Sequence, residues 1–155
     1  MYFTIEDLIK DLNTYFASGN ENNSIHCLQE ALYNYSSHDW KKYMFFDKNT
    51  YKKNIIIQEE TYELSLICLY PNQKTEIHDH AKNGCVIKVL EGQMDENQYK
   101  LINHKPVFEK LKIHNVNGNI YINNQIGLHN IHNNTDQNLV ILQLYSPSIY
   151  NINTW

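Results

Sequence analysis

The sequence predicts a mainly β fold, an antiparallel β-barrel or sandwich that follows a short N-terminal helical segment. Before Tyr51 the apolar residues recur with a period of about 3.6, and from Tyr51 onward they alternate as in strands. The alternating runs are short, and turn residues such as Asn, Gly and Pro separate them. Regularly spaced short strands of this kind are typical of antiparallel barrels and sandwiches.

Two helices and a helical turn are expected before the strands. Thr4 and Asp7 form a start close to a capping box, and the apolar spacing that follows runs to Gly19, which is expected to end the first helix. A second helix is expected to start at Ser24, and a short helical turn to cover residues 39–43. The apolar faces of these helices are expected to pack into a core. Those faces carry Ile5, Leu8, Ile9, Leu12, Phe16, Ile25, Leu28, Leu32 and Tyr35.

The expected strands extend over the rest of the chain, which has the length of one domain, 155 residues. They cover residues 51–58, 61–69, 76–80, 85–90, 93–100, 107–114, 119–122, 128–132 and 139–145. We therefore expect a single domain over residues 1–155. It comprises N-terminal helices over 1–43, a β-barrel over 44–150 and a C-terminal tail over 151–155.

Composition and charge exclude several classes of partner. The formal net charge is −4, with 13 Lys and Arg residues and no basic stripe, so nucleic acid and anionic membranes are poor partners. The sequence has neither an apolar run long enough to span a membrane nor a signal-peptide pattern at its start. Three widely spaced cysteines without a Cys-x-x-Cys pair fit a reduced, cytoplasmic setting.

Two histidines two residues apart, His78 and His80, stand in the β-patterned stretch PNQKTEIHDHAKNGCVIKVLEG. On a strand, both imidazoles would project from one face and Asp79 from the other. Two neutral imidazoles that point to one position can provide two ligands for a divalent metal ion. A third nitrogen is available from His129 in the stretch NNQIGLHNIHN. A His-x-His pair alone also occurs by chance on protein surfaces, so the interpretation depends on both stretches.

The remaining histidines and cysteines, apart from Cys85, are expected to be structural or exposed. On a regular strand His132 would face away from His129, because the two lie three positions apart and successive residues point to opposite faces. The full set is His26, Cys27, His38, Cys68, His104, His114 and His132.

The spacing of the two stretches resembles the two cupin motifs. The motif residues are His78, His80, Cys85 and Gly92 in the first stretch and Gly118, His129 and Asn133 in the second. Most cupins carry a Glu ligand where this chain has Cys85. With the strings IHDH, LEG, YINNQIGLHNIHN and LYSPS, this substitution resembles the cysteine dioxygenase family over nearly the whole chain, helical start included.

The resemblance implies a cupin barrel, a metal and a reaction. The metal would be Fe(2+), held by His78, His80 and His129, although zinc suits three histidines equally well by ligand type. The reaction would add both atoms of O2 to the sulfur of cysteine to give cysteine sulfinic acid, so a small thiol and O2 are the expected partners. Three neutral ligands leave the metal charge uncompensated, which favours a thiolate ligand. A monomer is the family-like expectation.

The resemblance also implies catalytic residues and substrate contacts. Tyr145 in LYSP is expected to orient the substrate and O2. In many relatives the Cys that matches Cys85 is joined to that Tyr by a thioether, so this crosslink is expected to be possible here; a buried core thiol is the alternative for Cys85. The segment YKKN resembles the family's Tyr-x-Arg-Asn, which assigns the substrate carboxylate to Lys53 and a supporting contact to Tyr51.

Three features depart from the family pattern. Lys53 replaces Arg, which exchanges a planar two-point grip for a point charge on a flexible stem, and an exposed Lys53 is the alternative. Animal relatives alternate Ser, His and Tyr on the last strand, whereas this chain has Ile141, Gln143 and Tyr145, and Gln143 does not titrate near neutrality. The third feature is the C-terminal tail, which is expected either to leave the site more open or to place Trp155 over it.

Two other functions stay open on the sequence. One is a dioxygenase for another small thiol, such as 3-mercaptopropionate or cysteamine. Loss of Lys53 should leave turnover of a thiol without a carboxylate unchanged, whereas it should sharply lower turnover of cysteine. The other is a cupin that binds a metal or small ligand without turnover.

Overall fold

The computed structural model describes residues 3–155, so the first two residues of the expected helical segment lie outside the described residues. The helices come first, as predicted. They are α1 (Ile5–Tyr15), the π-helical turn η1 (Phe16–Asn20), the 3-10 helix η2 (Ile25–Leu28), α2 (Gln29–Asn34) and the 3-10 helix η3 (Asp39–Tyr43).

The predicted boundaries of the first helix are confirmed by its capping contacts. The Thr4 hydroxyl accepts from the Asp7 backbone N–H at 3.1 Å, and the Asp7 carboxylate accepts from the Thr4 backbone N–H at 3.0 Å. Gly19 has a φ of +83°, a left-handed conformation that favours glycine, and the helical path ends there.

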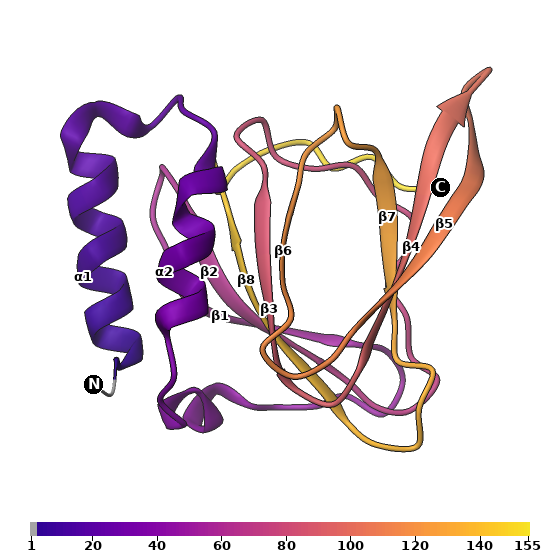
Figure 1. Cartoon of the computed structure of the whole chain (residues 1–155), viewed down its shortest axis with the longest axis horizontal. Coiled ribbons are helices and arrows are strands. Elements are labelled where there is room, and N and C mark those ends of the chain that lie inside the picture. The colour runs from indigo at the N-terminus through magenta and orange to yellow at the C-terminus, as the bar shows by residue number, and fades with distance from the viewer. Residues whose placement is uncertain (1–2) are drawn as a thin grey trace.

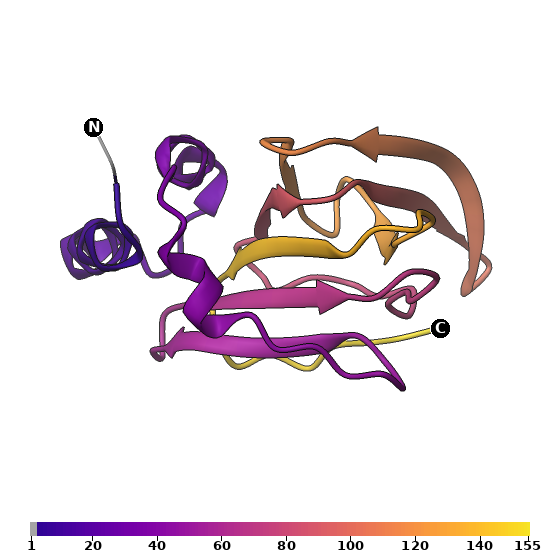
Figure 2. The same ribbon diagram turned by 90° about the horizontal axis from the view of Figure 1, so that it is seen from below.

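Within the described residues, eight strands follow the helices and form two antiparallel sheets that face each other (Figures 1 and 2). They are β1 (Lys52–Gln58), β2 (Glu63–Leu69), β3 (Cys85–Glu91), β4 (Met94–Ile102), β5 (Lys105–His114), β6 (Asn119–Ile122), β7 (Leu128–His132) and β8 (Leu139–Tyr145). The larger sheet has the order β1-β2-β8-β3-β6 and the smaller β5-β4-β7. The mainly β prediction is confirmed.

One expected strand, over residues 76–80, is wrong in detail. His78 forms isolated bridges with His129 and with Thr154, and the segment around it is otherwise irregular. The reason is that neighbouring backbone donors go elsewhere. The His80 N–H bonds the Asn124 side chain at 2.7 Å, and the Asp79 N–H bonds the Asn153 carbonyl at 3.2 Å. The segment nevertheless lies beside β7 and extends the smaller sheet.

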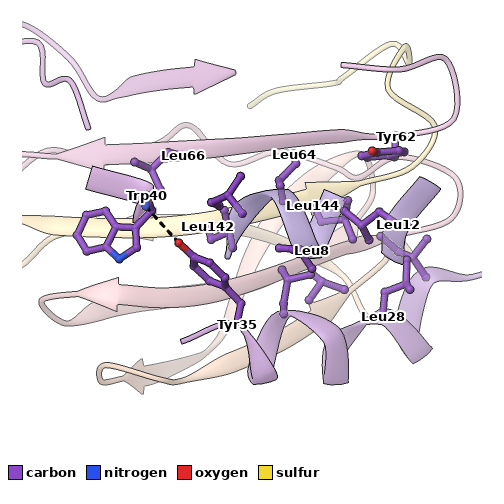
Figure 3. Packing of buried hydrophobic residues seen from close by; sticks show 14 of the residues in the cluster. Leu8, Leu12, Leu28, Tyr35, Trp40, Tyr62, Leu64, Leu66, Leu142 and Leu144 are labelled. Atoms are coloured by element: carbon purple, nitrogen blue, oxygen red, sulfur yellow. Dashed lines mark hydrogen bonds between the residues drawn. The ribbon is translucent and has the colours of Figure 1, made fainter. Parts of the chain in front are cut away.

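The central strands β2 and β8 of the larger sheet are almost entirely buried, which explains why their sequences are predominantly apolar. Leu64, Leu66, Leu142 and Leu144 point toward the helices and pack with Leu8, Leu12 and Tyr35 (Figure 3), whereas other residues of the same strands point into the barrel. The inner layer contains Ile67, Leu69, Cys85, Ile87, Met94, Ile131, Ile141 and Tyr145. The helices therefore hold the larger sheet rigid from outside, and the inner face is left for the site.

Within residues 3–155, none of the helices is both long and apolar enough to cross a membrane.

Candidate metal centre

Three histidines converge inside the barrel, as the sequence predicted. One ligand atom each from His78, His80 and His129 lies within 4.8 Å of the others. The ring centroids of His80 and His129 are 4.6 Å apart, and those of His78 and His80 are 5.4 Å apart. His129 projects from β7, and the two bridge hydrogen bonds between His78 and His129 fix the backbones side by side.

Two of the three rings are held by acceptors at Nδ1. The Nδ1 of His78 is 2.8 Å from the Glu76 carbonyl oxygen, and the Nδ1 of His129 is 3.1 Å from Oε1 of Glu96. Because a carbonyl and a carboxylate can only accept, each Nδ1 carries the proton. In the neutral ring Nε2 then presents a lone pair, which is the form that binds a metal ion.

His80 is buried, and within residues 3–155 neither of its ring nitrogens has a hydrogen-bond partner. An unpaired buried nitrogen is costly, so such a group calls for an explanation. A metal ion bound between the three rings would satisfy one nitrogen of His80. The donor set, three imidazoles that meet at one point, fits a divalent transition metal.

Burial also keeps the imidazoles of His78 and His80 neutral. Desolvation, followed by the neighbouring His129, lowers the pKa of His78 to about 4. The same two causes, with His78 as a third, lower the pKa of His80 to about 2. Both rings are therefore uncharged at neutral pH and available as ligands.

Glu96 is a site residue that the sequence interpretation missed. Its buried carboxylate receives His129 and Gln98 on Oε1 and His114 on Oε2, at 3.1, 3.0 and 2.9 Å. Burial opposes ionisation of Glu96, but these hydrogen bonds outweigh it and lower its pKa below the usual value. His114 is accordingly structural, as expected, with a definite partner. A usable signal was present, because Glu96 shares a strand face with Met94, an apolar residue of the kind that marks an inner face.

A cavity of about 520 Å3 opens beside His78 and contains the predicted substrate contacts. Tyr51, Lys53 and Tyr145 line it, together with apolar side chains such as Ile67. The ammonium of Lys53 lies 3.1 Å from the Tyr145 hydroxyl and 2.9 Å from Oε1 of Glu63. Lys53, Glu63 and Tyr145 thus form a second polar cluster, the Lys53–Glu63–Tyr145 cluster.

Glu63 was also missed by the sequence interpretation. It begins β2 directly opposite Tyr145 on β8, and this register cannot be read from either segment alone. Burial, and then the hydrogen bond and charge of Glu63, raise the pKa of Tyr145 well above its usual value. The phenol therefore keeps its proton throughout the neutral range.

Cys85 and Tyr145 are directly paired residues on β3 and β8, and both are buried. Side chains of directly paired residues point to the same face of a sheet and come within contact distance. Burial raises the pKa of the Cys85 thiol to about 12, and a hydrogen bond with Gln143 opposes that shift only partly. The two expected crosslink partners are thus brought together.

The tail borders the cavity, although Trp155 does not cover it. Tyr150, Ile152 and Thr154 line the cavity, whereas Trp155 faces a separate depression beside Lys100. Asn153 fixes this arrangement, because its side chain donates to the Asp79 carboxylate at 2.6 Å. Of the other polar residues discussed above, His26, Cys27 and His38 are exposed, and Cys68 is a buried core thiol.

Comparisons with solved structures agree with the fold. The protein TT1209 from Thermus thermophilus has a TM-score of 0.60 at 18% identity, covering 72% of this chain and 96% of its own. A Klebsiella pneumoniae protein with a double-stranded β-helix domain has a TM-score of 0.55 at 10% identity, covering 78% and 92%. At these identities the likeness concerns the fold alone, and it supports the expected cupin barrel.

Comparisons with sequences are more specific. Cysteine dioxygenase type 1 of Danio rerio is 30% identical over 98% of this chain and 79% of its own length. The human protein of the same name is 31% identical over 93% and 74%. The family model described as cysteine dioxygenase type I matches residues 3–155. The chain therefore belongs to the cysteine dioxygenase type I family.

Proposed function

We propose that this protein is an iron-dependent thiol dioxygenase that adds both atoms of O2 to the sulfur of cysteine, giving cysteine sulfinic acid. The observation that carries the proposal is the convergence of three imidazoles in a chain of the cysteine dioxygenase type I family. The reaction is inferred from the name of the relatives, and the three-histidine cluster is the proposed location of that reaction.

His78, His80 and His129 would hold Fe(2+) through Nε2 of the first and third and one nitrogen of His80. When bound, the metal would supply open coordination positions and the electron exchange with O2 that side chains lack. Three neutral ligands favour an anionic substrate group, so the thiol would bind as its thiolate. The contacts of Glu76 and Glu96 would keep two of the rings in the ligand tautomer.

The cavity residues would bind and orient the thiol. Lys53 would face the substrate carboxylate, and Tyr51 would close the same wall. Tyr145 keeps its proton and would orient substrate and O2 through its hydroxyl. The apolar wall around Ile67 would exclude water from the reacting sulfur. Cys85 and Tyr145 could also form a thioether, which would fix the phenol ring in place.

Oxygen uptake tests the proposal. The anaerobically Fe(2+)-loaded protein is mixed with cysteine, 3-mercaptopropionate or cysteamine in the presence of O2, and products are identified by mass. We expect cysteine to be consumed with a gain of two oxygen atoms. Uptake with another thiol alone would replace the substrate in the proposal. Absence of uptake with every thiol, despite full iron loading, would overturn it in favour of a non-catalytic cupin.

A further inference from the structure

The ammonium of Lys53 is already paired within the protein. It lies 2.9 Å from Oε1 of Glu63, whose side chain is 1% exposed, whereas the Lys53 side chain is 40% exposed. The other carboxylate oxygen of Glu63 accepts from the Gln58 amide at 3.2 Å. Lys53 thus points its charge at a carboxylate that solvent hardly screens.

Apart from the metal ion, which would attract the thiolate sulfur, the charged side chains around the cavity do not favour an anion. The ionic side chains that line it are Lys53, Glu63 and Glu76, one cation against two carboxylates, while His78 is neutral. Glu76 is exposed and therefore well screened, but Glu63 is not. A carboxylate brought up to Lys53 would be attracted by the ammonium and repelled by the buried Glu63 just behind it.

We propose that Glu63 is a specificity-determining residue, which offsets the charge of Lys53 and makes the cavity select small aminothiols over thiols whose only charged substituent is a carboxylate. This inference rests on the proposed function for its thiol ligand. It ranks the open substrates. Cysteine and cysteamine carry an ammonium group that the buried carboxylate of Glu63 attracts, whereas 3-mercaptopropionate carries no such group.

The test measures thiol binding directly and so does not require turnover. Dissociation constants of 3-mercaptopropionate and cysteamine are measured by calorimetry on anaerobic, Fe(2+)-loaded protein. For Glu63→Gln, which keeps the shape and removes the charge, we expect 3-mercaptopropionate to bind about tenfold more tightly and cysteamine several-fold more weakly. Glu109→Gln is the control, because it removes a carboxylate that pairs with Lys100 outside the cavity, and should change the ratio of the two constants by less than about twofold.

A second variant keeps the inference testable if the single one fails to fold. The double variant Lys53→Gln with Glu63→Gln removes both charges of the pair and so leaves neither charge without its partner. Because the two charges offset each other, the affinity for 3-mercaptopropionate should stay within about threefold of the natural protein. A tenfold loss would mean that Lys53 acts uncompensated, and would overturn the inference.

The remaining outcomes separate this inference from the proposed function. Equal changes for both thiols in Glu63→Gln would indicate a merely structural role and overturn the inference alone. Thiol binding with the expected shift but without oxygen uptake would overturn the proposed function and support the inference. Failure of the natural protein to bind these two thiols, and cysteine measured in the same way, would overturn both.

Discussion

Two polar clusters border the same cavity, and they are built on opposite principles. The three-histidine cluster is an array of imidazole rings, two of which are held at Nδ1 by acceptors, the Glu76 carbonyl and the Glu96 carboxylate. The Lys53–Glu63–Tyr145 cluster instead contains a charged pair, brought together from β1, β2 and β8. The first cluster was predicted from the histidine spacing, whereas the second includes Glu63, which the sequence interpretation missed.

The difference follows from what each cluster must satisfy. A metal ion requires ligand atoms of one type at one distance, so the spacing of the histidines is tightly constrained. A flexible substrate group requires only a complementary charge within reach, which several side-chain combinations can provide. The chemistry of the centre can therefore persist while substrate preference changes at the other cluster.

Removal of a ring from the three-histidine cluster should have the largest effect. His80→Ala should lower bound metal from about one equivalent to near zero and oxygen uptake by at least about 100-fold, since even an outer partner of a ligand is typically worth about 10- to 100-fold. Metal analysis and oxygen uptake on the purified variant measure both. His132→Ala on β7 is the matched control, because His132 lies outside the cluster. Full iron retention in His80→Ala would contradict the ligand set.

Removal of the carboxylate behind His129 should have a smaller effect. Three donors, His129, Gln98 and His114, converge on Glu96, and an amide in its place would turn its own N–H groups toward one of them. Glu96→Gln should therefore weaken Fe(2+) affinity by about tenfold or more, as measured by competition with a chelator.

The control for this variant is Glu109→Gln on the neighbouring strand. Glu109 pairs with the exposed Lys100, so its loss should leave metal affinity unchanged. An unaltered affinity in Glu96→Gln would show that His129 does not depend on Glu96 for its orientation.

The fold and the ligands could be predicted because their signals are local. The change of period near Tyr51, the cap at Thr4 and the His-x-His pair are each contained in a few residues. The irregular path at 76–80 could not be predicted, because it depends on Asn124 and Asn153, which lie far away in the sequence. The role of Glu63 could not be predicted for a similar reason. It depends on the strand register that places Glu63 opposite Tyr145 and near Lys53.

Of these changes, loss of Cys85, and with it of the proposed Cys85–Tyr145 crosslink, should have the smallest effect, because Tyr145 is also held by Lys53 and Glu63. Formation of the thioether joins the Cys85 sulfur to the Tyr145 ring and removes two hydrogen atoms, with O2 as the oxidant. We expect intact-mass measurement to show this loss in iron-loaded protein after turnover in air, and not in Cys85→Ser or Tyr145→Phe.

Activity of Cys85→Ser should fall only several-fold, because the phenol retains its other contacts. A collapse as deep as that of His80→Ala would mean that the crosslink, and not the Lys53–Glu63–Tyr145 cluster, positions the phenol.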